Sequence, residues 1–170
     1  MSAAPIRILG LDPGLGRMGW GVIDMEGTRL SHVAHGVLMS DAKLELAARL
    51  LALHKLLSAV IAEHRPVAIS VEQAFVAKDP LAALKLGHAR AVALLAAAQA
   101  GLEIAEYAPN HIKKCVVGVG HAGKEQVGAM VRRLLPTAKV EAADAADALA
   151  AAIAHAHLSG TRARLLKALA

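Results

Sequence analysis

The chain has 170 residues, enough to bury the core of one domain without help from metals or disulfides. Its hydrophobic content is 56%, yet its longest apolar runs fall far short of the roughly 20 residues of a membrane span, so we expect no membrane-spanning protein. The formal net charge of +5 favours a polyanionic partner such as nucleic acid. A single cysteine, Cys115, and a start without a signal peptide predict a reduced, cytoplasmic protein.

The first half of the chain predicts a group of strands around one helix. Strands are expected at residues 6–11, 20–24, 30–39 and 67–72, and a helix at 42–64. The first strand ends at Asp12-Pro13-Gly14, a turn sequence, so the first three strands should form an antiparallel meander. The fourth, VAISVE, is a continuous apolar run that ends in Glu72, as is typical of a central strand.

The second half is mainly helical. Helices are expected at residues 81–100, 109–117, 124–135 and 143–157, and a strand at 103–108. The helix at 81–100 is apolar nearly all round in its second half, which indicates burial on more than one side. Together these elements predict a single mixed-sheet α/β domain over residues 1–160, followed by a basic tail at 161–170 that we expect to fray.

A glycine loop at residues 117–125, VGVGHAGKE, contains most of the signature of a nucleotide triphosphate loop. The spacing G-x-x-x-x-G-K runs from Gly118 through Gly123 to Lys124, but Glu125 stands where the motif needs the Ser or Thr that binds Mg²⁺. A carboxylate at that position would repel phosphates. We therefore favour a glycine loop that leads into a helix, and we expect no ATP.

Four acids lie where this architecture exposes side chains: Asp12, Glu72, Asp144 and Asp147. The first two end strands, where sites in α/β sheets lie, and the last two share one helix face. Singly, each has an ordinary explanation as a turn residue, an exposed strand end or a helix cap. Together they would repel one another unless divalent cations occupied the site.

Oxygen ligands of this kind select Mg²⁺ or Mn²⁺. Two such ions roughly 4 Å apart stabilise both the attacking water and the leaving oxygen of a phosphodiester. A zinc site is not expected, because His155 and His157 stand two apart on a helix and point to different faces.

Four segments carry a resemblance to a known family: ILGLDPGLGRMGWGVI, VEQAFVAKDPLAALKLGHARAVAL, EYAPNHIKKCVVGVGHAGKEQV and ADAADALAAAIAHAH. In this order and spacing they resemble the bacterial RuvC Holliday-junction resolvases of the ribonuclease H-like superfamily, over nearly the whole chain. One departure is Met18, where the family usually has a small polar residue; it does not touch the acids.

The resemblance implies a ribonuclease H-like fold, with a mixed five-stranded sheet flanked by helices. It implies an Mg²⁺-dependent endonuclease that resolves four-way DNA junctions by paired symmetric nicks in recombination and repair. The four acids would be catalytic and would bind two Mg²⁺ ions, which Mn²⁺ can replace. The DNA-contacting residues would be Phe75, Lys78, Lys113 and Lys124. The implied partners are four-way junction DNA, a second copy of the chain, and the junction-bound helicase complex of RuvA and RuvB.

Two other functions compete with this one. An actin-like or sugar-kinase-like ATPase also begins with a strand that ends in D-x-G, but that fold uses two such domains around its nucleotide and this chain is long enough for one. An inert junction-binding protein is disfavoured because all four acids are present. The homodimer has independent support from residues 81–100, whose many small residues would let a partner helix approach closely.

Overall fold

The computed structural model describes the backbone of residues 4–73 and 79–169, and the side chains of these as far as residue 161. Within these residues the strands are β1 (Ile6–Asp12), β2 (Arg17–Glu26), β3 (Arg29–Met39), β4 (Ala68–Glu72) and β5 (Glu103–Tyr107). The helices are α1 (Leu46–His64), α2 (Pro80–Gln99), α3 (Pro109–Val117), α4 (Lys124–Leu134) and α5 (Ala143–Leu169). Every predicted element is present, in the predicted order.

The strands form one mixed sheet in the order β3-β2-β1-β4-β5. Strands β1, β2 and β3 pair antiparallel, which confirms the predicted meander. Strand β4 pairs parallel with both β1 and β5, so it lies inside the sheet as predicted. Because β1 and β4 run in the same direction, their carboxyl ends meet at one edge of the sheet.

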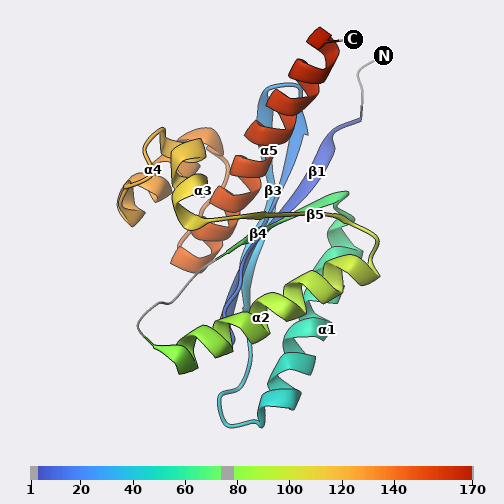
Figure 1. Cartoon of the computed structure of the whole chain (residues 1–170), viewed down its shortest axis with the longest axis vertical. Helices are drawn as coiled ribbons and strands as arrows, with labels where there is room; N and C mark the ends of the chain where they lie inside the picture. Colours follow the sequence, from blue (N-terminus) through green and yellow to red (C-terminus); the bar gives the residue numbers. More distant parts are fainter. Residues whose placement is uncertain (1–3, 74–78, 170) are drawn as a thin grey trace.

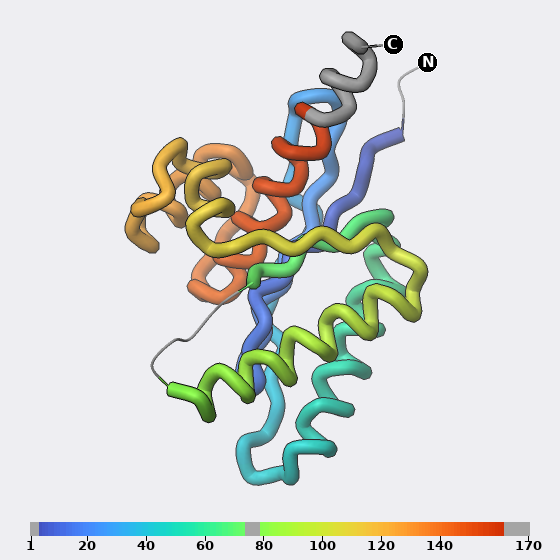
Figure 2. The backbone as a smooth tube through the Cα atoms, in the orientation of Figure 1, coloured from blue at the N-terminus to red at the C-terminus, as the bar shows by residue number. Residues whose placement is uncertain are grey.

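Helices cover both faces of this sheet (Figure 1). Helices α1 and α2 pack on one face, where large apolar side chains such as Leu53, Leu57 and Ile69 are fully buried. Helix α5 crosses the other face, and α3 and α4 pack against it (Figure 2). The domain therefore has three layers around two apolar clusters.

The alternation of side chains along β1 and β4 decides which face receives the acids. Leu9 and Leu11 of β1 lie in the cluster under α1 and α2, so Gly10 and Asp12 face α5. Strand β4 repeats the pattern, with Ile69 and Val71 on the first face and Ser70 and Glu72 on the second. The alternation along both strands thus places Asp12 and Glu72 on the α5 face.

Glycines let α5 lie unusually close to the sheet. A Cβ atom added to Gly10 would stand 1.9 Å from the carbonyl oxygen of Ala148, and one added to Gly19 would stand 1.9 Å from that of Asp144. Neither distance is sterically allowed, so a larger residue at either position would push the helix away. The helix contributes small residues of its own, and Ala148 and Ala151 are fully buried against the strands.

Two boundaries differ from the sequence-based expectation. Helix α1 begins at Leu46 rather than at residue 42, because Asp41 holds a turn: its Oδ1 accepts a hydrogen bond from the amide of Lys43, and its carbonyl accepts one from the amide of Leu44. At the other end, α5 continues as helix to Leu169, so residues 161–169 extend that helix. The division of the chain at residue 160 stays a prediction.

Helix α2 is the one helix in the described parts of the chain that is long and apolar enough to cross a membrane, and 28% of its apolar window is buried. Core helices of soluble proteins pass the same test, so this is weak evidence. Arg90, in the middle of α2, forms an ion pair with Glu106 of β5, while Ala89 and Ala93 are buried in the domain core. We therefore treat α2 as a helix of the domain.

Candidate active site

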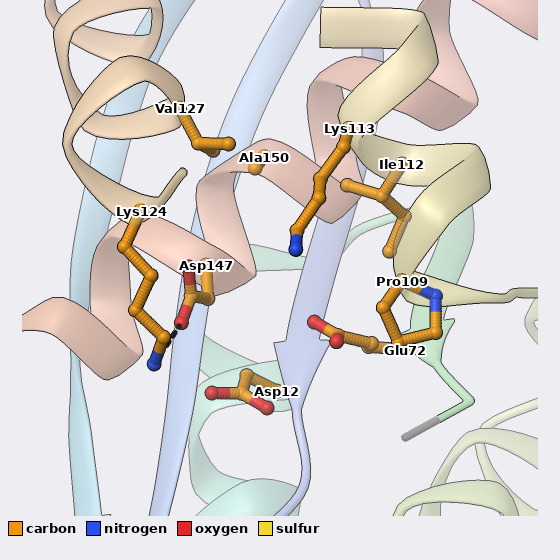
Figure 3. A pocket seen from close by; sticks show the side chains of 9 residues that line it. All are labelled: Asp12, Glu72, Pro109, Ile112, Lys113, Lys124, Val127, Asp147 and Ala150. Atoms are coloured by element: carbon orange, nitrogen blue, oxygen red, sulfur yellow. Dashed lines mark ion pairs between the residues drawn. The ribbon is translucent and has the colours of Figure 1, made fainter. Parts of the chain in front are cut away.

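Two of the predicted acids lie side by side at the carboxyl ends of β1 and β4. Leu11 and Val71 are register partners in this parallel pair, so the residues that follow them, Asp12 and Glu72, are neighbours on the α5 face. Figure 3 shows both carboxylates in one pocket. Their convergence follows directly from the parallel pairing of the two strands.

A third acid, Asp147, reaches the same pocket from α5. The pocket has a volume of about 260 Å³, and its lining consists of acids, lysines and small or apolar residues: Asp12, Glu72, Pro109, Ile112, Lys113, Lys124, Val127, Asp147 and Ala150. The close packing of α5 on the sheet brings Asp147 into the same pocket as the strand-end acids. Its charge therefore raises the pKa of both Asp12 and Glu72.

The fourth acid, Asp144, lies one helical turn earlier, and it does not line this pocket. Its carboxylate accepts a hydrogen bond from Arg17, with 2.7 Å between Arg17 Nε and Asp144 Oδ2. It remains close enough for its charge to raise the pKa of Asp12. The structure thus brings three predicted acids into one pocket and holds the fourth beside them in an ion pair.

Two of the predicted lysines enter the pocket from α3 and α4. Lys113 points from α3 toward Glu72 and Asp12 in Figure 3. Lys124 is the first residue of α4, and its Nζ atom lies 3.6 Å from Asp147 Oδ2. Phe75 and Lys78, the other two predicted DNA-contacting residues, lie outside the described residues.

The glycine loop between α3 and α4 explains how both lysines face the acids. Gly118 ends α3 with a φ of 95°, a left-handed conformation that favours glycine. The amide of Gly123 then donates to the side chain of Gln126, at 2.9 Å, and this bond fixes the start of α4 at Lys124. The loop reverses the chain so that the two helices present Lys113 and Lys124 to one pocket.

Burial and mutual repulsion make the acids weak in this pocket. Burial, followed by the charges of Glu72, Asp147 and Asp144, raises the pKa of Asp12 to about 7, although Lys124 opposes the shift. Burial followed by the charge of Asp147 raises the pKa of Glu72 to about 6. The pKa of Asp147 is also raised, chiefly by burial, although Lys124 opposes the shift. Such clustered shifts are typical of functional sites.

The donor chemistry of the pocket fits divalent metal ions that prefer oxygen. As the described side chains stand, no group of three or more His, Cys, Asp or Glu residues is arranged to hold a metal ion. The three pocket acids nevertheless offer only carboxylate oxygens, which suit Mg²⁺ and Mn²⁺. The two lysines offset only part of the repulsion among the three carboxylates, whose pKa values stay raised. A divalent cation would relieve this repulsion.

Sequence reasoning missed residues that support the site from behind. Ser70, fully buried two residues before Glu72, donates a hydrogen bond to the carbonyl of Ala151 on α5, at 2.8 Å. The Tyr107 hydroxyl lies 2.9 Å from Nδ1 of His155, which ties β5 to the same helix. A single polar residue inside the apolar run VAISVE was the available signal for Ser70. The sequence held no signal for the pair of Arg17 and Asp144, which lie 127 residues apart.

The sheet order, the acids at the ends of β1 and β4, and a final helix that carries further acids across the same face define a ribonuclease H-like protein. The solved structures agree. This chain is similar to Thermus thermophilus RuvC in complex with a Holliday junction substrate, with a TM-score of 0.87 and 31% identity over 92% of this chain and 96% of that one. It shares the fold of the yeast mitochondrial Holliday junction resolvase Ydc2 at 12% identity and a TM-score of 0.66, over 94% and 83% of the two chains.

Sequence comparisons identify the family. Residues 8–155 match the family model described as crossover junction endodeoxyribonuclease RuvC. A protein of that name from Parvibaculum lavamentivorans is 58% identical over 164 residues, which is 96% of this chain and 94% of the relative. This chain belongs to the RuvC family. The resemblance drawn from the sequence motifs is thereby confirmed.

Proposed function

We propose that this protein is a structure-selective endonuclease that resolves four-way DNA junctions by paired symmetric nicks. The observation that carries the proposal is the convergence of Asp12, Glu72 and Asp147 with Lys113 and Lys124 in one pocket. The pocket lies on the fold of a family whose Thermus member was solved with a Holliday junction substrate. Acids that can hold two cations suit two-metal hydrolysis of a phosphodiester, and lysines beside them can bind its phosphate.

Asp12, Glu72, Asp144 and Asp147 would hold two Mg²⁺ ions, or Mn²⁺ in their place. When bound, such ions activate a water and stabilise the leaving oxygen of a phosphodiester. The raised pKa values of Asp12 and Glu72 mean that protons compete for these carboxylates near neutral pH. The site should therefore work best above pH 7, where the carboxylates are ionised.

The lysines would position the scissile phosphate. Lys113 and Lys124 project into the pocket from two different helices, so they can contact the phosphate from separate directions. Lys124 is 81% exposed, and its contact with Asp147 is long at 3.6 Å, which leaves it free to move to DNA. Phe75, which follows the Glu72 strand, would stack on unpaired bases at the crossover, and Lys78 would contact the backbone.

A symmetric homodimer would supply the second active site. Resolution into two duplexes needs two nicks related by a two-fold axis, and a two-fold dimer presents two identical sites with that symmetry. The face formed by α1 and α2 suits this role, because Leu51 and Leu95 are each more than half exposed and line an apolar groove. The proposed setting is the cytoplasm, where the dimer would act on junctions bound by RuvA and RuvB.

The decisive experiment incubates the purified protein with an end-labelled four-way junction and Mg²⁺. We expect paired nicks in strands of like polarity, and no cleavage of a linear duplex of the same sequence. Asp12→Asn, Glu72→Gln, Asp144→Asn and Asp147→Asn should each abolish cutting while junction binding survives, because binding depends mainly on contacts to phosphate. Glu26→Gln, which removes an exposed acid at the β2–β3 turn, is the matched control and should cut normally. Equal cleavage of duplex and junction would overturn the proposal.

A separate experiment addresses the dimer. Sedimentation at micromolar concentration should give about twice the monomer mass of 17.5 kDa. Ala93 of α2 is fully buried, so Ala93→Glu would place a charge in the core and destabilise the fold. A loss of the dimer in that variant would not separate the interface from the fold. Leu95→Glu changes a residue that is 54% exposed, and should yield folded monomers that lose paired nicking. A monomeric wild type that still makes paired cuts would remove the symmetry argument.

A further inference from the structure

The ion pair between Arg17 and Asp144 sits at the rim of the acidic pocket. Arg17 is the first residue of β2, and its Nε atom lies 2.7 Å from Asp144 Oδ2. The side chains are 50% and 33% exposed, so both groups remain accessible to a ligand from solution. Arg17 is therefore placed to influence the one predicted acid that does not line the pocket.

The close packing of α5 fixes this pair next to Asp12. Gly19 is the register partner of Asp12, and its backbone lies directly against the carbonyl of Asp144. Arg17 stands two residues before Gly19, so its side chain leaves β2 on the same face. The geometry thus brings a guanidinium, a carboxylate and the Asp12 end of the pocket together.

Asp144 cannot serve Arg17 and a divalent cation equally well. A guanidinium at 2.7 Å occupies a carboxylate oxygen, and its charge repels any cation that approaches the same group. The pair between Lys124 and Asp147 is looser, at 3.6 Å, so it presents a weaker obstacle. Of the two pairs, the one with Arg17 must change more when the site is loaded.

We propose that Arg17 is a transfer residue, which pairs with Asp144 in the free protein and moves to a phosphate of the junction when Asp144 binds a divalent cation. This inference rests on the proposed function. The guanidinium presents its donors in a planar fork that fits a phosphate as well as a carboxylate, so the exchange keeps its hydrogen bonds satisfied.

The exchange couples cation binding to DNA binding. A cation at Asp144 releases Arg17 for the phosphate, and a phosphate that binds Arg17 frees Asp144 for the cation. Linkage requires the two effects to be equal, so the factor by which Ca²⁺ tightens junction binding must equal the factor by which the junction tightens Ca²⁺ binding. Arg17 would help the protein to load its acidic site when the substrate is present.

The test measures junction affinity by fluorescence anisotropy, in EDTA and again in Ca²⁺, with strand integrity checked on a denaturing gel. In EDTA, Arg17→Ala should bind the junction within twofold of the wild type, because Arg17 is then engaged with Asp144. In Ca²⁺ the same variant should bind roughly five- to tenfold more weakly, because a charged phosphate contact is lost. Arg29→Ala, which removes an exposed arginine at the start of β3, at the opposite end of the β2–β3 pairing from Arg17, should leave the Ca²⁺ effect unchanged.

A second measurement follows Ca²⁺ binding without DNA, by calorimetry. Arg17→Ala should bind Ca²⁺ severalfold more tightly than the wild type, because Asp144 is no longer paired and a nearby positive charge is gone. Arg17→Lys keeps the charge and should give an intermediate value. It also serves as the test variant if Arg17→Ala does not fold.

Three results would overturn the inference. Equal weakening in EDTA and in Ca²⁺ would make Arg17 a simple phosphate contact, and no change in either would make the pair merely structural. An Arg17→Ala protein with unchanged Ca²⁺ affinity would show that Arg17 and the cation do not compete for Asp144. Failure of the proposed function looks different, because the wild type itself would then bind four-way junctions no better than duplexes and would not cut them with Mg²⁺.

Discussion

The two faces of the sheet solve different packing problems. Under α1 and α2, large side chains such as Leu9, Leu57 and Val71 fill the space and hold the helices at an ordinary distance. Under α5, glycines on the strands meet alanines on the helix, and the backbones come into direct contact. Both faces contribute a buried apolar cluster to the core. The second face sacrifices buried side-chain volume so that a helix can carry acids to the ends of two strands.

The α5 face also carries an electrostatic cost that the other face lacks. The acids at its edge are partly buried, and burial is the largest cause of the raised pKa in Asp12, Glu72 and Asp147. Substitutions on the two faces should therefore have opposite signatures. On the α1 and α2 face they should lower stability and spare the site, and on the α5 face they should change the site itself.

The largest effect is expected from Gly19→Ala. The added Cβ would stand 1.9 Å from the Asp144 carbonyl, which is backbone and cannot rotate away. We expect a loss of roughly 4 to 5 kcal/mol in the free energy of unfolding, measured by urea denaturation, together with loss of junction cleavage.

Gly87→Ala is the matched control, since nothing lies within 4 Å of its added Cβ on α2. It should raise stability by about 0.5 to 1 kcal/mol because alanine favours helix. A Gly19→Ala protein with wild-type stability and cleavage would show that α5 does not depend on close contact with β2.

The opposite face is tested by Leu57→Ala. Leu57 is fully buried in α1, so the substitution should leave a cavity and cost about 3 kcal/mol. Cleavage per folded molecule and Mg²⁺ affinity should stay within twofold of the wild type, because, among the described residues, none that lines the acidic pocket belongs to this cluster. A fall in Mg²⁺ affinity would mean that the two faces are coupled.

The sequence predicted the elements and the site acids better than it predicted the contacts between them. The carboxyl-end rule was enough to predict that Asp12 and Glu72 could converge, and the helical spacing suggested a shared face for Asp144 and Asp147. The structure separates the last two: Asp147 enters the pocket and Asp144 pairs with Arg17. That outcome depends on where α5 crosses the sheet, which Gly10 and Gly19 decide and which no local pattern encodes.

The start of α1 shows a smaller limit of the same kind. Apolar spacing extended the predicted helix to residue 42, but Asp41 satisfies the amides of Lys43 and Leu44 in a turn. Such competition between a side chain and the helix is local, and the sequence DAKLE contained the signal, because Asp favours turns and helix caps over helix interiors. The error therefore arose from the weight given to apolar periodicity.

The electrostatic cost of the α5 face is tested by Asp12→Asn. The folded-state pKa of Asp12 is raised from 3.8 to about 7, so above pH 7 the ionised group destabilises the folded state, and the penalty disappears as pH falls toward 4. In EDTA at pH 8 the variant should be more stable than the wild type by about 2 to 3 kcal/mol, since each pKa unit corresponds to about 1.4 kcal/mol and relaxation reduces the total.

The two stability curves should converge toward pH 4. Added Mg²⁺ should stabilise the wild type at pH 8 more than it stabilises the variant. Thermal and urea unfolding across this pH range provide the measurement. A variant that is less stable than the wild type at pH 8 would contradict the assignment of a buried, repelled carboxylate at this position.

The smallest effect is expected from Ser70→Ala, which removes a contact that sets the register between β4 and α5. Ser70 stands two residues before Glu72, and its partner, the carbonyl of Ala151, stands one helical turn after Asp147. The loss should cost only about 1 kcal/mol in the free energy of unfolding, because the hydroxyl is removed together with its need for a partner.

Mg²⁺ affinity should nevertheless fall severalfold in Ser70→Ala, since the bond fixes the strand that carries Glu72 relative to the helix that carries Asp147. Junction binding in EDTA should not change. Ser159→Ala is the control, because the bond that the Ser159 hydroxyl makes to a described residue lies within α5, to the carbonyl of Ala156 at 3.3 Å. This variant should leave Mg²⁺ affinity unaltered. If Ser70→Ala lowers stability and leaves Mg²⁺ affinity intact, the bond holds the layers together without positioning the acids.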